Sequence, residues 1–525
     1  MVRVRHEVNS LGGDWPDTLV WYAKAIKALQ ARPFATKTSW RFLAAMHGWH
    51  PVVWREFGVI TANEPAPSNA VQKRFMNQCQ HQSWYFLPWH RGYISALEQL
   101  LLDAVVKAGG PADWALPYWN YSKTANPTAR RLPGAFSATT MPDGSSNPLR
   151  VTRRFGSGTT PIVIPAAQVT LEALEHDDFI GGSADIPPGF GGPVTLFHHG
   201  PESETTNGGL ESGPHNVVHG AIGGSAAGLD PNEWQNWGLM SAPWTAALDP
   251  IFWLHHANID RLWTTWQRTN AFPIDPNWLD GPADREFVMP TPNGGEWEYT
   301  ASDVLDSALA PLDYVYDDEE AQPEVPMSGS NRRRRRLESL ETAPEDARGG
   351  GADEGAEMEM DGSPQLIGAS DGGVRVAGET RDEIRMDAPG TEALRRSLDR
   401  AMVPGNEALQ EPARVFLKLE GIRGTADSAN YYVYIDMPPG EGGAEVTERL
   451  AGNLSLFGVS AASDKDGPNA GSGINQVIEI SEIVDDMHLS GDQLEALRVR
   501  FVPANETVAE ADFSIGRVSV FMLGS

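Results

Sequence analysis

The segment 321–362 constrains the fold more than any other part of the chain, because it cannot belong to a hydrophobic core. It is rich in Pro, Gly, Glu and Arg and has very few aromatic or β-branched residues. Such a segment cannot bury enough apolar surface to offset the entropy lost when it is ordered. We therefore predict a mobile, protease-sensitive linker between two domains, residues 1–320 and residues 363–525.

The overall composition predicts a soluble globular protein without a membrane span. Hydrophobic residues make up 41% of the chain and charged residues 21%, and no apolar run approaches the roughly 20 residues of a membrane-spanning helix. The formal net charge of −29 argues against nucleic acid and anionic membranes as partners, since both are negative themselves. Acidic runs flank the five arginines at 332–336, so this short basic run does not change that expectation.

The single cysteine, Cys79, excludes an intrachain disulfide. The first ten residues, MVRVRHEVNS, lack the apolar region of a secretory signal. We therefore expect a cytoplasmic location, with export alongside a partner protein as the alternative. The oligomeric state is not indicated by these features.

The two parts of the chain predict different secondary structure. All 17 tryptophans and 12 of the 13 histidines precede residue 300. Four segments there, SWRFLAAMHG, FLPWHRGYISALEQLLLDAVVKAGG, PHNVVHGAIGG and DPIFWLHHANIDRLWTTWQ, have helical patterns, and each carries histidine. Pro88 and Pro214 suit the first position of their helices, and Asp249 suits an N-cap. We expect a mainly α domain, a helical bundle with histidines pointing inward.

Beyond residue 362 the pattern has a period of two. VFLKLEGI, YYVYIDM, NLSLFGV, QVIEISEI, LRVRFVP and GRVSVFML alternate apolar and polar residues between turns rich in Gly, Asp, Asn and Pro. This alternation is typical of half-buried strands, and its regular recurrence predicts an antiparallel β-sandwich.

The histidines of the first part indicate a metal site. His215 and His219 are four residues apart, so both imidazoles lie on one face of a helix and can reach one ion. His256 or its neighbour His255 would complete that site, and a second set on the earlier segments consists of His47, His81 and His90. Ligand sets made only of imidazole favour copper, since calcium and magnesium prefer oxygen; zinc remains an alternative.

These segments resemble the copper-binding regions of the tyrosinase, catechol oxidase and molluscan haemocyanin family. The resemblance is carried by MHG around His47, CQHQSWYFLPWHR, PHNVVH and DPIFWLHHANIDRLW, in the same order and with similar spacing. It implies a coupled pair of copper ions that reacts with dioxygen. The implied ligands are His47, His81 and His90 for the first copper and His215, His219 and His256 for the second.

Two further sites follow from the resemblance. Cys79 lies two positions before His81, where relatives join a cysteine sulfur to the histidine ring by a thioether bond. The phrase GGLESGPHN resembles plant polyphenol oxidases, in which a glutamate and an asparagine hold a water molecule beside the metals. Those positions are Glu211 and Asn216 here. The implied role is to take the proton of a phenol, whose pKa is near 10, so that it can bind copper as phenolate.

The later part of the chain extends the resemblance. Tyr314, Val315 and Tyr316 resemble a motif that closes the catalytic domain of relatives by packing against an arginine, for which Arg5 is the candidate. VYIDMP and AGNLSLFG resemble the C-terminal β domain of haemocyanins and latent polyphenol oxidases, which inserts an apolar side chain over the copper pocket. Phe457 is the candidate plug, with Leu456 next.

The predicted function is therefore a latent dicopper phenol oxidase. It would use dioxygen to oxidise small phenolic substrates: o-diphenols would become o-quinones, and monophenols would be hydroxylated. An activating protease would cut the linker. A haemocyanin-like oxygen-binding protein, an o-aminophenol oxidase and a histidine-ligated zinc hydrolase are the alternatives.

Overall fold

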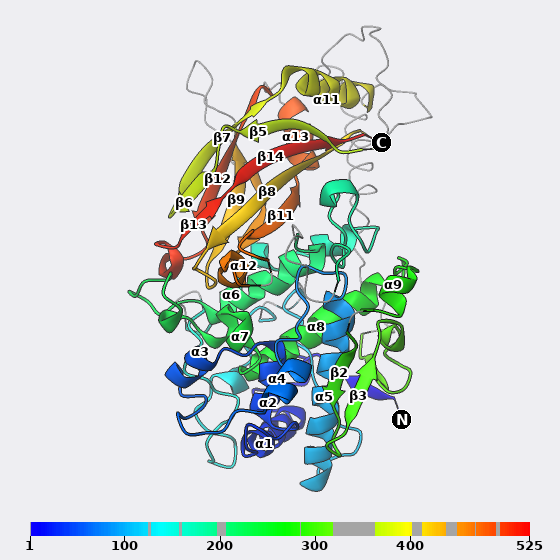
Figure 1. Cartoon of the computed structure of the whole chain (residues 1–525), viewed down its shortest axis with the longest axis vertical. Coiled ribbons are helices and arrows are strands. Elements are labelled where there is room, and N and C mark those ends of the chain that lie inside the picture. The colour runs from blue at the N-terminus through cyan, green and yellow to red at the C-terminus, as the bar shows by residue number, and fades with distance from the viewer. Residues whose placement is uncertain are drawn as a thin grey trace.

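The computed structural model describes residues 2–123, 126, 128–156, 160–196, 206–283, 285–318, 363–401, 412–436, 449–467, 469–489 and 494–524. The predicted linker 321–362, with its arginine run, lies outside the described residues, and the predicted domain boundaries stay predictions. Helices dominate the described residues up to 318 and strands those from 363 onward (Figure 1). The predicted fold class, a mainly α domain followed by a β domain, is confirmed. Within the described ranges, no helix combines the length and the apolar character that a membrane span requires.

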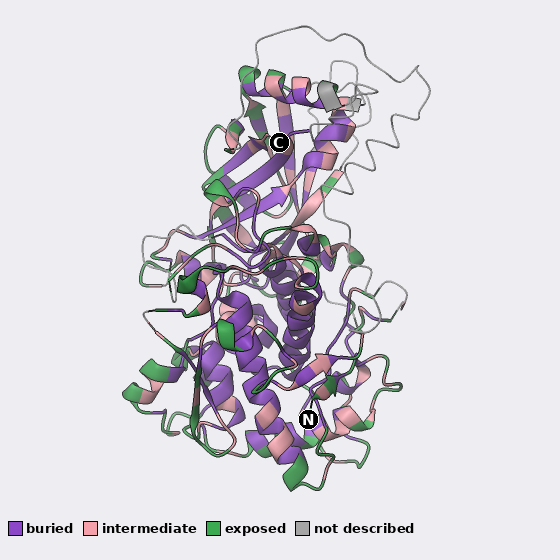
Figure 2. Cartoon of the chain, turned by 90° about the vertical axis from the view of Figure 1, so that its right-hand side faces the viewer, coloured by how far each residue is buried: buried purple, intermediate pink, exposed green. Residues whose placement is uncertain are grey.

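Two long helices form the centre of the helical domain. α5 (Phe86–Lys107) and α8 (Pro250–Trp266) pack against each other, and both are buried on almost every side. Helices buried on almost every side lie inside a core, and Figure 2 shows this buried centre in purple. Around them lie α1 (Asp17–Gln30), α2 (Trp40–His47), α3 (Pro51–Glu56), α4 (Asn69–Phe75), α6 (Val217–Gly223), α7 (Pro243–Ala246), α9 (Pro276–Leu279) and the hairpin of β2 (Phe287–Pro290) and β3 (Glu296–Tyr299).

The predicted helix starts hold for α8 and shift for two other helices. Asp249 caps α8, its side chain accepting a hydrogen bond from the backbone N–H of Ile251 at 3.1 Å. α5 begins at Phe86 rather than Pro88, because proline is tolerated throughout the first turn, where backbone N–H groups have no helical partner. α6 begins only at Val217, since a π-helical turn, Glu211–Asn216, with Gly213 in extended backbone precedes it.

The two ends of the helical domain are joined to each other. β1 (Arg3–Arg5) pairs in parallel with β4 (Tyr314–Tyr316). The Arg5 guanidinium lies 3.4 Å from the ring centroid of Tyr314, and it donates hydrogen bonds to Glu98 at 2.9 Å and to the Tyr316 hydroxyl at 3.0 Å. The prediction that the tyrosine motif packs against Arg5 is confirmed. We call this arrangement the β1–β4 clasp.

The described residues from 363 onward, which we call the lid, form an antiparallel sheet of ten strands and the helices that cover it. Nine strands follow the order β10-β9-β12-β7-β5-β14-β8-β13-β6, and β11 pairs with the other edge of β8. Alternate residues of the strands share one core, so the halves of the sheet face each other as in a sandwich. The strands are β5 (Gln365–Ser370), β6 (Val374–Ala377), β7 (Thr380–Met386), β8 (Arg414–Gly424), β9 (Asn430–Asp436), β10 (Arg449–Ser455), β11 (Ile474–Glu479), β12 (Ala496–Pro503), β13 (Asp512–Ile515) and β14 (Arg517–Leu523); the helices are α11 (Ala388–Ala401), α12 (Val459–Ser463) and α13 (Ser481–Leu489).

The lid sits on the helical domain over α6 (Figure 1). Side chains of the lid donate hydrogen bonds to backbone carbonyls below: Lys418 to Ala184 at 2.9 Å and Asn453 to Ala167 at 2.6 Å. Buried polar groups are costly unless they are paired, so these bonds specify how the two surfaces fit.

Candidate metal centre

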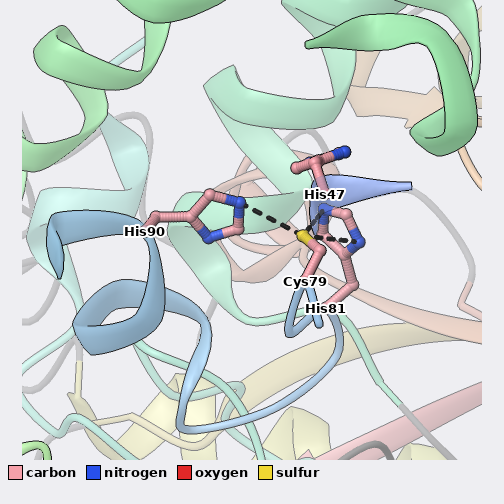
Figure 3. Close-up of side chains that lie close together, drawn as sticks. All are labelled: His47, Cys79, His81 and His90. Atoms are coloured by element: carbon pink, nitrogen blue, oxygen red, sulfur yellow. Dashed lines mark hydrogen bonds between the residues drawn. The ribbon is translucent and has the colours of Figure 1, made fainter. Parts of the chain in front are cut away.

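The first histidine cluster contains His47, His81, His90 and Cys79. His47 is the last residue of α2, His90 lies in the second turn of α5, and Cys79 and His81 lie in the segment before α5. One nitrogen or sulfur atom from each of the four side chains lies within 4.8 Å of the others (Figure 3). The three predicted ligands of the first copper therefore converge from separate parts of the sequence.

Backbone carbonyls fix the rings of this cluster. The Nδ1–H of His47 donates to the carbonyl of Pro243 at 2.7 Å, and that of His90 donates to Phe86 at 2.7 Å. Each ring then presents Nε2 as the available ligand atom, and Nε2 of His47 is buried without a hydrogen-bond partner. Burial lowers the pKa of His47 to about 4, and it also lowers the pKa of His90, so both rings are neutral as metal binding requires.

Cys79 lies against the His81 ring. Its Sγ lies 3.6 Å from both Nδ1 and Nε2 of His81 and 3.3 Å from Nε2 of His90. The sulfur is therefore in contact with the His81 ring and equidistant from its two nitrogens. Burial raises the pKa of the Cys79 thiol, which keeps it protonated.

The second cluster lies between the π-helical turn, α6 and α8. Ligand atoms of His215, His219, His255 and His256 lie within 4.8 Å of one another. The Nδ1–H of His219 donates to the carbonyl of Met240 at 2.9 Å, which leaves Nε2 buried and without a partner. The Nδ1–H of His215 donates a hydrogen bond to Oδ1 of Asn216 at 2.7 Å. Burial lowers the pKa of all four histidines.

His255 and His256 occupy different positions in this cluster. The ring of His256 stacks on His90 of the first cluster at 4.5 Å, and its Nε2 lies 3.3 Å from Nε2 of His215. His255 instead forms a hydrogen bond through Nδ1 with the Tyr121 hydroxyl at 3.0 Å. The assignment of His256 as the ligand stays a prediction, and its position between the two clusters agrees with it.

The donor chemistry fits two copper ions. Among the described residues, the two groups consist of imidazoles and one thiol, without a carboxylate. The unpartnered Nε2 atoms of His47 and His219 are buried polar groups that need a partner, and a metal ion would supply it.

Glu211 and Asn216 lie in the π-helical turn that carries His215. Glu211 is 1% exposed, and this burial raises the pKa of its carboxyl to about 8 although the backbone N–H of Gln82 donates to it. The Glu211 carboxyl accepts hydrogen bonds from the backbone N–H groups of Gln82 and Gly208, whereas the Asn216 side chain is hydrogen-bonded to His215. A direct bond between the two is not among those of the described residues.

The lid reaches the second cluster through Phe457. Its ring stacks on His219, with centroids 4.1 Å apart and planes 19° apart, and it meets the rings of His81 and His215 edge-on at 5.7 and 5.9 Å. Phe457 is 3% exposed and packs in the core of the helical domain, whereas Leu456 packs in the core of the lid. Of the two plug candidates, Phe457 is the one that the structure places against the histidines.

Three contacts beside the cluster were not predicted from the sequence. Ser455 donates to the carbonyl of Asn216 at 3.0 Å, and the Asn430 amide donates to that of Val217 at 2.8 Å. Gly220 makes room for Asn430, because a Cβ at position 220 would lie 2.5 Å from Asn430 Oδ1. These residues are more than 200 positions apart in the chain, so no local pattern could have paired them.

Comparisons with known proteins agree with this geometry. Residues 37–181 and 189–269 match the family model "Common central domain of tyrosinase", and residues 363–522 match "Domain of unknown function (DUF7868)". A tyrosinase from Hahella sp. (strain CCB-MM4) is 31% identical over 532 residues, covering 96% of both chains. A chloroplastic polyphenol oxidase from Vitis vinifera is 29% identical over 250 residues, which is 45% of this chain and 37% of that protein.

A solved structure shares the whole architecture. Latent apple tyrosinase aligns with a TM-score of 0.57 and 18% identity, covering 100% of this chain and 97% of that chain. This similarity supports the fold, a helical domain followed by a β domain. The full-length match to the Hahella tyrosinase shows the family. The chain belongs to the tyrosinase family and is an oxidoreductase of the tyrosinase type.

Proposed function

We propose that this protein is a copper-dependent phenol oxidase that uses dioxygen. The observation that carries the proposal is the pair of buried imidazole clusters, joined by the stacking of His90 on His256 at 4.5 Å. Two o-diphenols and one dioxygen would give two o-quinones and two waters. A monophenol and one dioxygen would give one o-quinone and one water.

Six histidines would hold the two metal ions: His47, His81 and His90 for the first, and His215, His219 and His256 for the second. Bound copper supplies the redox chemistry with dioxygen. The contribution of the protein is to orient the rings, since the carbonyls of Pro243, Phe86 and Met240 hold Nδ1 of three of them. Fixed rings would present their Nε2 atoms to the two ions in a defined orientation.

The phenol ring would take the place of Phe457. That side chain stacks on His219 at 4.1 Å, so the surface of the His219 ring already accommodates an aromatic ring. Glu211, beside the second cluster, would accept the phenol proton, acting with Asn216 through water as relatives imply. A buried carboxylate with a pKa of about 8 is matched to this task at neutral pH.

Latency is part of the proposal. With Phe457 in place, an aromatic substrate is excluded from the His219 ring, so the enzyme is inactive until the lid moves. A protease that cuts the linker near 332–336 would permit this movement. We keep the cytoplasmic location as a further proposal, which cell fractionation tests.

We also propose the thioether between Cys79 and His81. The sulfur lies 3.6 Å from both ring nitrogens of His81, in contact with the ring. An S–C bond would replace the S–H and C–H bonds, and dioxygen would take up the two electrons and two protons. Mass spectrometry of the peptide containing both residues should show a mass lower by two hydrogen atoms.

The closed pocket also favours a second candidate, an oxygen-binding protein, because Phe457 excludes phenols but not dioxygen. The test is to load the chain with copper and measure oxidation of catechol and tyrosine before and after tryptic cleavage of the linker. We expect two coppers per chain and a large rise in quinone formation on cleavage. Copper loading without oxidation of either phenol after release of the lid would contradict the oxidase and support the carrier. Two zinc ions and no copper would contradict both.

A further inference from the structure

Gln82 has an unusual backbone conformation at a sensitive position. It follows the ligand candidate His81, it is 6% exposed, and its φ angle is 53°. The left-handed region is uncommon for residues other than glycine, so other contacts must hold Gln82 there.

The consequence of this conformation is a hydrogen bond to Glu211. The backbone N–H of Gln82 points at the carboxylate, 2.7 Å from Oε2 and 3.0 Å from Oε1. A buried carboxylate needs such a donor, because burial otherwise disfavours its charged form. The N–H thus orients the side chain proposed as the base and, together with the backbone N–H of Gly208, favours its charged form.

The side chain of Gln82 connects the same residue to the lid. Its Oε1 accepts a hydrogen bond from Nδ2 of Asn469 at 2.9 Å. Asn469 precedes β11 in the lid and is 3% exposed. A single buried residue therefore lies between the lid and the Glu211 carboxylate.

We propose that Gln82 is a positioning residue for Glu211, and that Asn469 of the lid helps to hold Gln82 in the conformation that aims its N–H. The inference rests on the proposed function, in which Glu211 takes a proton from the phenol. It implies that the lid contacts the proton-accepting apparatus as well as covering the metal pocket.

The first test compares two substitutions at position 82, made in the full chain carrying Phe457→Ala to open the pocket. Gln82→Val disfavours the left-handed backbone, since a β-branched residue rarely adopts it, whereas Gln82→Asn tolerates it and keeps the N–H. We expect Gln82→Val to lower kcat/KM about tenfold for a phenol of pKa about 10, and Gln82→Asn to retain most of the rate.

The acidity of the substrate distinguishes positioning from a structural effect. A phenol with electron-withdrawing substituents, already ionised at the assay pH, needs no base, so Gln82→Val should leave its rate within about twofold. Equal losses for both phenols, or a fall in bound copper, would overturn the proposal and assign Gln82 to the support of His81. If neither phenol is oxidised by the parent chain or after linker cleavage, the proposed function fails instead.

The second test substitutes residues of the lid and leaves the sequence of the helical domain unchanged. Asn469→Ala removes the hydrogen bond to Gln82. Asn453→Ala is the matched control, because it removes the hydrogen bond that a different lid asparagine donates to the carbonyl of Ala167. We expect Asn469→Ala to lower the rate on the less acidic phenol about threefold relative to the acidic one. Asn453→Ala should leave that ratio unchanged. The same ratio in both variants would refute the role of Asn469.

Discussion

The two histidine clusters differ in what holds them. The first is fixed by the helical domain: backbone carbonyls orient His47 and His90, and Cys79 lies against His81. The second contacts the lid closely, through Phe457 stacked on His219 and through lid hydrogen bonds to the carbonyls of Asn216 and Val217. The lid therefore acts mainly on the second cluster. The first cluster meets the lid less closely, through the edge-on approach of Phe457 to His81 at 5.7 Å, so we expect control of access mainly at the second.

Removing one histidine from each cluster should have the largest effect. His47→Ala and His219→Ala should each lower bound copper from about two ions to about one per chain and reduce phenol oxidation about a thousandfold or more. Only His219→Ala should also weaken lid docking, since it removes the ring on which Phe457 stacks. Metal analysis and the rate of tryptic lid release measure the two effects. His488→Ala, in the lid, is the control for losing a histidine.

Phe457→Ala should activate the intact chain about thirtyfold, because it opens the second cluster while the other lid contacts remain. The measurement is catechol oxidation without proteolysis. Phe457→Leu keeps an apolar plug and should activate much less. An uncleaved Phe457→Ala chain as inactive as the parent would show that the lid does not act through this ring.

Gly220→Ala should activate the intact chain less, about fivefold. The added Cβ would lie 2.5 Å from Asn430 Oδ1, so either the side chain or the lid must shift. Alanine itself favours a helix, so α6 should not be weakened. The double variant Gly220→Ala with Asn430→Ala removes the obstruction. Activity that stays raised in the double variant would mean that the clash is not the cause.

Asp427 should give the smallest effect, through the turn that carries Phe457. Its carboxylate accepts hydrogen bonds from the backbone N–H and hydroxyl of Ser460 at 2.7 and 2.8 Å, and burial raises its pKa from 3.8 to about 7. Because the folded-state pKa lies above the ordinary value, this group's contribution to stability is full below about pH 4 and is lost as the pH rises through about 7.

Asp427→Asn should therefore flatten the pH dependence of the melting temperature of the lid between about pH 4 and 7, with a shift of a few degrees at pH 8. Calorimetry across that range measures it. A variant with the parent's pH dependence would place the titrating group elsewhere. A Ser460→Ala control keeps the carboxylate and should keep a pH dependence at least as large, because the lost hydroxyl bond favoured the charged form.

The same comparison shows what could be predicted from the sequence. The histidines of both clusters were predictable, because helical spacing and helix-end signals are local and the motifs around them resemble a known family. The π-helical turn before α6 was not, since Gly213 and Pro214 suit an ordinary helix start equally well. The contacts of Asn430 and Ser455 with the second cluster, and the hydrogen bond between Asn469 and Gln82, could not be predicted either. A contact between two folded surfaces leaves no periodic pattern in either segment.

The β1–β4 clasp has a consequence for how the protein can be processed. β4 ends at Tyr316, so the last strand that closes the helical domain precedes the predicted linker. A cut at any position beyond residue 318 leaves the contacts of Arg5 with Tyr314 and Tyr316 intact. The two ends of the helical domain then stay joined to each other. The proposed activation by proteolysis would therefore tolerate different cleavage sites and still leave the same closed helical domain.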